Sequence, residues 1–198
     1  VKDQGFMGSC WAFGNMAALE SSLLRYTNTT YSLSVNNMQN SMLMYSKYGV
    51  DTIKEGGNPY TSVGYLIDWL GVFPDEFDGY DELGKISSLY ITPDDIHIQN
   101  VVILPPIKNA ADRDLIKSAL IKYGAVAVSH CANFDTSKYF NKSSSAQYCY
   151  DTKDSTHRVC IVGWDDNYSR YNFLKTPEGD GAWIIKNSWG TQWGDEGY

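Results

Sequence analysis

Residues 4–13 read QGFMGSCWAF and carry a cysteine, Cys10, at the point where a polar approach gives way to an apolar run. Apolar residues recur at a three-to-four spacing from Phe13 to Leu24, which predicts a helix that begins at the cysteine and is capped by Ser9. A thiol in the first turn of a helix meets free backbone N–H groups and the positive end of the helix dipole, which favour the thiolate. An isolated cysteine is more often a small buried side chain, but that role requires no glutamine six residues upstream. The segment therefore favours a nucleophile.

A second segment, residues 156–164, reads THRVCIVGW, in which His157 enters an apolar strand that ends in a glycine and an aromatic residue. The other two histidines, His97 and His130, lack this context and are expected to be ordinary surface or core side chains. His157 follows Cys10 by roughly 150 residues, a separation expected when nucleophile and base come from opposite lobes. It is the candidate base.

A third segment, residues 183–190, reads WIIKNSWG. Together the three segments resemble the papain-like cysteine peptidases, whose local signature is Cys-Gly-Ser or Ala-Cys followed by an aromatic residue, with His and Asn far downstream. Met7 stands where the first cysteine of that signature belongs. This departure removes one half of a structural disulfide typical of the family and leaves Cys10 untouched.

The resemblance implies a role for each residue of the catalytic set. Cys10 is the nucleophile, and His157 takes the thiol proton to form a thiolate–imidazolium pair and later protonates the leaving amine. Asn187 holds the imidazole through its side-chain oxygen, and Trp189 shields that bond from water. Gln4 donates its side-chain amide to the developing oxyanion together with the backbone N–H of Cys10.

A weaker match concerns the substrate. Residues 55–60 read EGGNPY and are similar to the glycine pair on the family's cleft wall, where an extended peptide can hydrogen-bond to Gly57 as an added strand. The same residues also read as a Gly-Gly-Asn-Pro turn, which is compatible with that role. By the same resemblance, Tyr60, Ser129 and Thr156 lie near the pocket for the side chain two positions before the scissile bond. The residues expected to bind substrate are Gly56, Gly57, Tyr60, Ser129, Thr156 and Trp189.

Local patterns predict helices in the first half of the chain and strands in the second. Further helices are expected at 35–43 after a Ser34 cap, at 63–70 ending at Gly71, and at 112–123 closed by Gly124. Runs rich in Val and Ile predict strands at 98–104, 125–128, 159–164 and 182–186. Residues 75–95 are expected to form a surface loop that crosses between lobes, and residues 133–156 a long exposed loop.

These patterns and the resemblance imply an α+β, papain-like two-lobe fold. We expect residues 1–198 to form a single catalytic domain, with a helical N-terminal lobe over about 1–95 and a β-rich, barrel-like C-terminal lobe over about 96–198. The active-site cleft is expected between the two lobes.

The composition excludes several function classes. A formal net charge of -7 and a pI near 4.8 argue against nucleic-acid binding and against attraction to anionic membranes. No apolar run approaches the roughly 20 residues needed to span a bilayer. The four cysteines lack the paired spacing of zinc ligands, so neither a metal nor a cofactor is expected. Cys131 and Cys149 are the candidate disulfide pair, whereas Cys160 is expected to be a buried thiol in a core strand.

Two features concern the context of the chain. It begins at the cysteine motif and stops at Gly197-Tyr198, so a domain excerpt or a trimmed chain is expected, with an inhibitory propeptide in a precursor. The given residues do not read as a signal peptide, and a secreted, extracellular or cell-surface peptidase is expected. The low cysteine count favours a prokaryotic or archaeal relative over a lysosomal one.

One residue departs from the family pattern beside the base. Arg158 stands where family members usually have a small residue. If its side chain points toward His157, like-charge repulsion opposes protonation of the imidazole. If it points away along the strand, that effect is absent.

The leading hypothesis is a cysteine-type endopeptidase that forms a thioester acyl-enzyme on Cys10, with peptides or proteins as substrates. Two alternatives stay open on sequence grounds. One is a catalytically silent homologue that binds peptides in the same cleft. The other uses the same Cys–His chemistry for acyl transfer or amide deconjugation.

Overall fold

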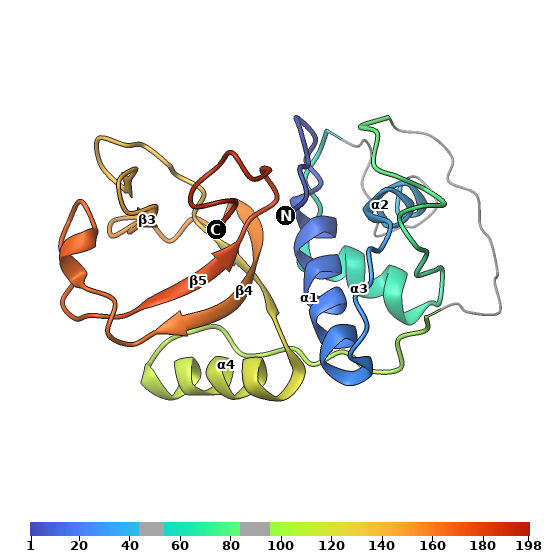
Figure 1. Cartoon of the computed structure of the whole chain (residues 1–198), viewed down its shortest axis with the longest axis horizontal. Coiled ribbons are helices and arrows are strands. Elements are labelled where there is room, and N and C mark those ends of the chain that lie inside the picture. Colours follow the sequence, from blue (N-terminus) through green and yellow to red (C-terminus); the bar gives the residue numbers. More distant parts are fainter. Residues whose placement is uncertain (44–53, 84–95) are drawn as a thin grey trace.

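The computed structural model describes residues 1–43, 54–83 and 96–198. Figure 1 shows helices gathered at one side of the molecule and the strands at the other. The helices are α1 (Cys10–Thr27), α2 (Val35–Ser41), α3 (Pro59–Ile67) and α4 (Ala110–Tyr123), with a short 3₁₀ helix at Arg170–Asn172. The strands are β1 (Val126–His130), β2 (Phe140–Asn141), β3 (Ala146–Gln147), β4 (His157–Asp165) and β5 (Ala182–Lys186).

Helices α1, α2 and α3 enclose the larger hydrophobic core. Trp11, Met16, Met38 and Tyr65 are among its fully buried side chains. The hydroxyl of Tyr65 donates to Asn37 Oδ1 at 2.5 Å, so this core contains a hydrogen-bonded polar pair as well as apolar contacts.

Side-chain caps explain where most helices begin. The Ser34 hydroxyl accepts from the backbone N–H of Asn37 at 2.9 Å, which confirms the predicted cap of α2. Asn58 and Asn109 form capping boxes at the starts of α3 and α4. Ser9 differs from the prediction, because its hydroxyl bonds to the Tyr80 hydroxyl at 2.8 Å and makes no side-chain cap. Helix α1 nevertheless begins at Cys10, as predicted.

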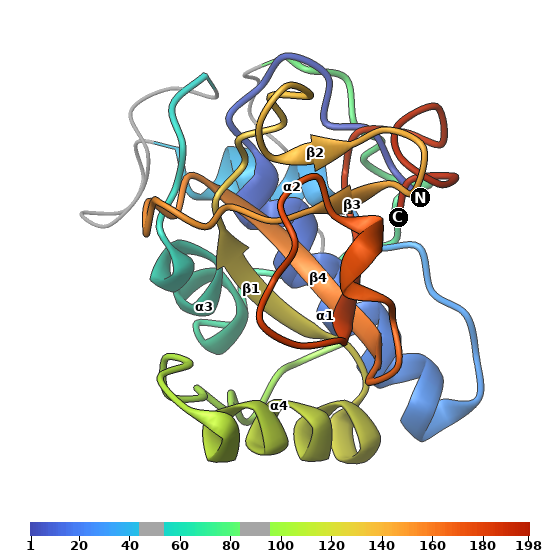
Figure 2. The ribbon, with the colours of Figure 1, turned by 90° about the vertical axis from the view of Figure 1, so that its left-hand side faces the viewer.

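The second core lies between a three-stranded antiparallel sheet, in the order β1-β4-β5, and helix α4 beneath it (Figure 2). Ile116 and Leu120 of α4 pack against Ile161 of β4. Val128 pairs with Val159, and the β4–β5 register shifts between Ile161 and Gly163. Among the described residues the sheet is open, so the expected barrel-like closure is not confirmed.

Three sequence predictions of secondary structure were wrong. Residues 98–104 form no strand; Ile98 packs on the helical core and Leu104 on the sheet core, so this run bridges the cores without a strand partner. Helix α3 starts at Pro59 and ends at Ile67, because Trp69 has a positive φ of 54° that a helix cannot contain. The predicted loop 133–156 contains the β2–β3 hairpin. Residues 84–95 of the predicted crossing loop lie outside the described residues.

All four cysteines are free thiols in the structure, so the predicted Cys131–Cys149 disulfide is absent. The two residues are nevertheless neighbours, with Cys149 Sγ 3.9 Å from the Cys131 carbonyl oxygen. Burial and the adjacent Cys131 side chain raise the pKa of the Cys149 thiol to about 12. Cys160 is a buried core thiol, as predicted.

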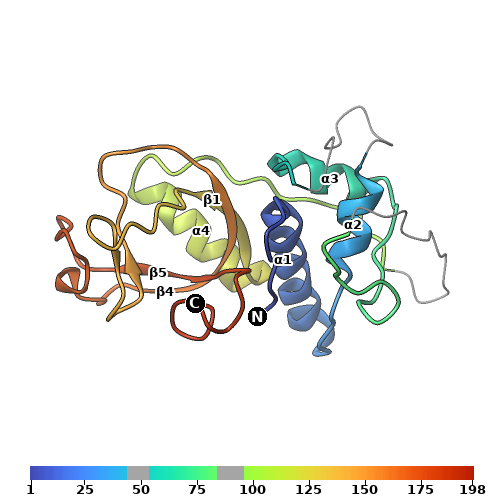
Figure 3. The same cartoon turned by 90° about the horizontal axis from the view of Figure 1, so that it is seen from above.

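Helix α1 is the element that joins the two cores, and Figure 3 shows it between the sheet and helices α2 and α3. A Cβ at Gly14 would lie 3.2 Å from Arg158 Cγ and 3.3 Å from the Val159 carbonyl oxygen. The absence of a side chain at this position therefore lets the helix approach β4 closely. This contact sets the start of α1 against the start of β4.

A pair of histidines lies at that end of the sheet. His130 of β1 is directly opposite His157 of β4, and their ring centroids are 5.7 Å apart. Burial lowers the pKa of His130 to about 4, and the neighbouring His157 adds to the effect. His130 is therefore held neutral in the folded protein.

Replacement of His130 with glutamine is expected to reduce the acid sensitivity of the fold. Because the pKa of this histidine is about 4 when folded and near 6.5 when unfolded, the unfolded chain binds more protons between those pH values. The folded state should then lose up to about 1.4 kcal/mol per pH unit as the pH falls through that window. Urea unfolding at several pH values between about 7 and 4.5 measures the slope.

His97→Gln is the matched control, since His97 is exposed and stacks on Trp69. It should retain the full wild-type dependence of stability on pH. An unchanged slope in His130→Gln would show that this histidine is not held neutral by burial.

Candidate active site

Cys10 is the first residue of α1, and its thiol faces the start of β4. The backbone N–H groups of Arg158 and Trp11 and the Arg158 charge favour the thiolate. Burial opposes them and is the largest effect, so the pKa of the Cys10 thiol is raised. The backbone N–H groups at the helix end favour the thiolate, as predicted. Burial has the larger effect on the Cys10 pKa in the resting site.

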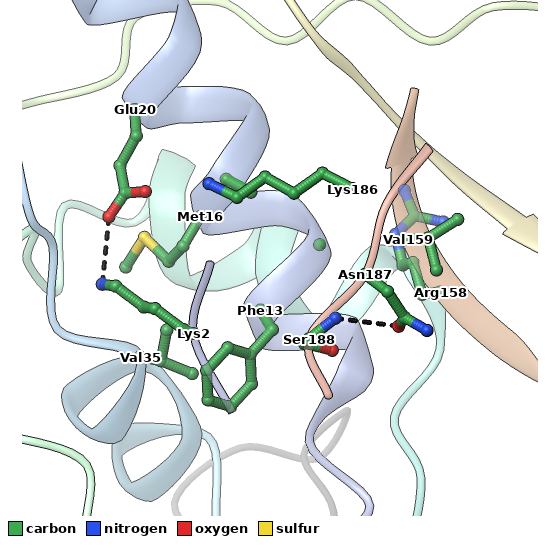
Figure 4. Close-up of a pocket in the computed structure, with 12 residues that line it drawn as sticks. Lys2, Phe13, Met16, Glu20, Val35, Arg158, Val159, Lys186, Asn187 and Ser188 are labelled. Atoms are coloured by element: carbon green, nitrogen blue, oxygen red, sulfur yellow. Dashed lines mark hydrogen bonds and ion pairs between the residues drawn. The ribbon is translucent and has the colours of Figure 1, made fainter. Parts of the chain in front are cut away.

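His157, the first residue of β4, is buried, and its Nε2 lies 2.7 Å from Asn187 Oδ1. Asn187 directly follows β5, and its Oδ1 also accepts from the backbone N–H of Ser188 at 2.8 Å (Figure 4). A backbone N–H can only donate, so the atom it contacts must be the amide oxygen. Nε2 of His157 must therefore carry a hydrogen, which leaves Nδ1 of the neutral ring as the proton acceptor.

The imidazole is shielded by an aromatic cluster. The Trp189 ring lies 4.8 Å from the His157 ring, and Phe134 and Trp193 pack edge-on against the indole. Burial lowers the pKa of His157, whereas the hydrogen bond to Asn187 raises it. The burial effect is larger, so the neutral ring is favoured.

Gln4 is held beside this pair by the opposite end of the chain. Its backbone N–H donates to the Ser188 carbonyl at 2.8 Å, and its side-chain Oε1 accepts from the Ser188 hydroxyl at 2.7 Å. Its Nε2 donates to the Met7 carbonyl at 2.8 Å. An amide nitrogen carries two hydrogens, so one further donor remains on Nε2.

A small cavity lies behind these residues. Its volume is about 20 Å³, room for about one water molecule, and it lies between α1 and the segment at Asn187 and Ser188 (Figure 4). Lys2 closes one side by donating to Glu20 Oε1 at 3.0 Å and to the Leu33 carbonyl at 2.7 Å. This bridge connects the N-terminal segment to α1.

The predicted substrate-binding residues lie in different surroundings. Gly57 lies against Trp11, because a Cβ there would be 2.7 Å from the indole, while Gly56 is exposed with open space around it. Tyr60 and Ser129 both line a cavity of about 750 Å³. Thr156 is not among the lining residues of that cavity, and its hydroxyl accepts from the Ala132 N–H at 3.1 Å.

Arg158 turns away from His157. Its Nη1 donates to Ser129 Oγ at 3.1 Å, and its Nη2 donates to Asn15 Oδ1 at 3.1 Å. Burial is the cause of the lowered His157 pKa, and Arg158 does not contribute to it. The repulsion considered from the sequence is therefore absent.

Sequence reasoning missed three contributors to the site. Ser188 joins Gln4 to Asn187, Asn15 holds Arg158, and Phe134 packs on Trp189. Ser188 could have been found, since it belongs to the quoted NSWG block. Phe134 comes from the segment read as an exposed loop, and no local signal distinguishes it.

No group of three metal-ligating side chains occurs within residues 1–43, 54–83 and 96–198. In the same part of the chain, no helix is long and apolar enough to cross a membrane.

Comparisons with known proteins agree with this geometry. The family described as papain family cysteine protease matches residues 1–198. Pro-cathepsin H of Mus musculus is 31% identical over 201 residues, which cover 100% of this chain and 54% of that protein. The chain thus spans about half the length of the curated relatives it matches.

Solved structures are similar as well. The cysteine protease and lectin-like domains of Cwp84, a surface layer associated protein of Clostridium difficile, align with a TM-score of 0.77 and 30% identity over 96% of this chain and 42% of that one. The proform of Amb a 11, a ragweed pollen allergen, aligns with a TM-score of 0.74 and 26% identity over 100% of this chain and 54% of that one. With a family match over its whole length, a two-core α+β fold and the Cys–His–Asn arrangement, this chain belongs to the papain family of cysteine proteases.

Proposed function

We propose that residues 1–198 form one catalytic domain, with a helical lobe over about 1–95 and a β-rich lobe over about 96–198, that hydrolyses peptide bonds as a cysteine endopeptidase. The observation that carries the proposal is the 2.7 Å bond between His157 Nε2 and Asn187 Oδ1. It leaves Nδ1 to act as the base, at the end of β4 that meets the start of α1.

The proposed reaction has two halves. His157 Nδ1 takes the proton of the Cys10 thiol as the thiolate attacks the scissile carbonyl, and a tetrahedral oxyanion forms. The free Nε2 hydrogen of Gln4 and the backbone N–H of Cys10 stabilise that oxyanion. The C–N bond then breaks, the amine leaves with the proton from His157, and a thioester remains on Cys10. Water, deprotonated by His157, hydrolyses the thioester and regenerates the thiol.

The electrostatics of the site suit a proton transfer that is coupled to substrate binding. Burial favours the neutral thiol and the neutral imidazole in the resting enzyme. The charge pair formed during the reaction meets groups already in place: the N–H of Trp11 beside the sulfur and the Asn187 oxygen beside the ring. These dipoles need no reorientation when the charges appear.

Peptides or proteins are the proposed substrates. An extended peptide would hydrogen-bond along Gly56 and Gly57, whose small size leaves the backbone accessible beside Trp11. Trp189 would flank the cleft, and Tyr60, Ser129 and Thr156 would lie near the side chain two positions before the scissile bond. Because Gln4, Cys10, His157 and Asn187 are all retained, a silent homologue is disfavoured.

We extend the proposal to the precursor and the location. The ragweed relative was solved in its proform and the mouse relative is a pro-cathepsin, which supports a precursor with an inhibitory propeptide. The surface-layer association of Cwp84 supports an extracellular or cell-surface location.

Replacement of Cys10 with alanine is expected to abolish peptide hydrolysis. Loss of a covalent nucleophile lowers kcat by about 10⁴-fold or more. Cleavage of a peptide library by the purified protein measures this, and mass spectrometry should locate an epoxide peptidyl inhibitor on Cys10.

Cys149→Ser is the matched control, because the raised pKa of that thiol keeps it protonated and unreactive. It should retain activity and labelling. Full activity in Cys10→Ala would disprove the proposed function, and transfer of the acyl group to an added amine in place of water would favour an acyltransferase.

Replacement of Gln4 with alanine is expected to lower kcat by about 100-fold to 1000-fold with little change in KM, since the lost donor acts on the transition state. Steady-state kinetics on one peptide separate the two constants. Ser188→Ala removes only the hydroxyl that orients the Gln4 amide and should give a smaller loss. Wild-type kcat in Gln4→Ala would exclude this amide from the oxyanion site.

A further inference from the structure

Arg158 is a half-buried cation that has no anionic partner among the described residues. Its hydrogen-bond acceptors in the structure are the neutral oxygens Asn15 Oδ1 and Ser129 Oγ. No carboxylate among the described residues lies within ion-pair distance of its guanidinium. Burial lowers the pKa of Arg158 and outweighs the opposing effect of the nearby Cys10 and Cys160, so the desolvation of the guanidinium is not fully offset among the described residues.

Arg158 and both of its hydrogen-bond partners line the cavity of about 750 Å³, which lies between α1, α3, α4 and β1 and is also lined by residues of the 98–107 segment. Its walls are mainly aliphatic, with Leu19, Val63 and Ile116 as examples. The charged residues that line it are Arg158 and Lys153, and no Asp or Glu is found among its described lining residues. In a chain of net charge -7, this cavity is a local concentration of positive charge.

Such a cavity has the chemistry to bind a carboxylate on a short aliphatic stem. The planar guanidinium binds carboxylates with two parallel hydrogen bonds, and these charge-assisted bonds strengthen where water is excluded. The aliphatic walls would contact the methylene groups of the stem. Among peptide side chains, glutamate combines both features.

The position of the cavity relates it to the cleavage site. Arg158 directly follows His157, and Asn15 lies five residues after Cys10 on α1, about 7.5 Å along the helix axis. Two residues of an extended peptide span about 6.6 Å. Tyr60 and Ser129, proposed above to lie near the side chain two positions before the scissile bond, line the same cavity.

We propose that Arg158 makes this protein selective for peptides with an acidic side chain, glutamate above all, two positions before the scissile bond. The inference rests on the proposed peptidase function, because it assigns a substrate class to that same site. Arg158 is then a specificity-determining residue that contacts substrate.

The test compares two peptides that differ only by Glu or Gln at that position, so that size is matched and charge is not. Wild-type kcat/KM should be at least about tenfold higher for the Glu peptide, the range of a hydrogen-bonded charge pair. In Arg158→Gln the ratio of the two values should fall to about one, whereas Arg158→Lys should keep part of it. Glu–Gln pairs at neighbouring positions should show no such ratio.

Lys142→Gln is the matched control, since it removes one positive charge from an exposed residue that does not line the cavity. It should retain the wild-type ratio. If Arg158→Gln does not fold, as judged by circular dichroism, the wild-type and Arg158→Lys ratios decide the question.

The outcomes separate the two proposals. Cleavage of both peptides at equal rates by the wild-type protein overturns the specificity and leaves the peptidase function standing. An unchanged Glu–Gln ratio in Arg158→Gln also overturns it, because Arg158 would then only clamp α1 to β1. Failure to cleave any peptide, with no iodoacetamide labelling of Cys10, overturns the proposed function and the inference with it.

Discussion

The close approach of α1 to β4 at Gly14 is the contact on which the rest of the structure depends. It brings together a helix from the first part of the chain and a strand from the last part, each packed into its own core. Because no side chain separates them, the first residue of the helix, Cys10, meets the start of strand β4 at Arg158. The proposed nucleophile, Cys10, and the proposed base, His157, are far apart in sequence, and this contact places the starts of α1 and β4 that carry them together.

The two ends of the chain complete this arrangement. Gln4 pairs with Ser188 through the backbone and through the side chain, and Gly190 donates to the Lys2 carbonyl at 3.2 Å. Ser188 also donates to the Asn187 oxygen, so a continuous set of hydrogen bonds links Gln4 to His157. Members of such a network orient one another, so the position of the Asn187 oxygen beside His157 is linked to a residue at the opposite end of the chain.

The sequence predicted elements whose signals are local. The strand at Ala182–Lys186 matched its predicted bounds, and the Ser34 cap formed as expected, because each depends on neighbouring residues. The strand predicted at 98–104 was wrong because a run rich in Val and Ile has the same sequence pattern whether it pairs in a sheet or lines a cavity. Likewise, the motifs marked Cys10, His157 and Asn187 as candidate site residues, whereas the direction of the Arg158 side chain depended on Asn15 and Ser129, which only the fold brings near.

At the start of β4, two neighbouring side chains point to opposite faces of the strand. This alternation separates His157, the proposed base, from Arg158, the proposed specificity residue. Successive side chains of a strand point to opposite faces, so His157 meets Asn187 and Trp189 while Arg158 enters the cavity beside α1. Substitution at position 158 can therefore change the charge of that cavity without moving the imidazole. Yet the Arg158 charge also favours the Cys10 thiolate, and a bound carboxylate would offset part of that effect. The selectivity proposed for Arg158 thus requires that the gain in binding an acidic side chain exceed the loss of thiolate stabilisation.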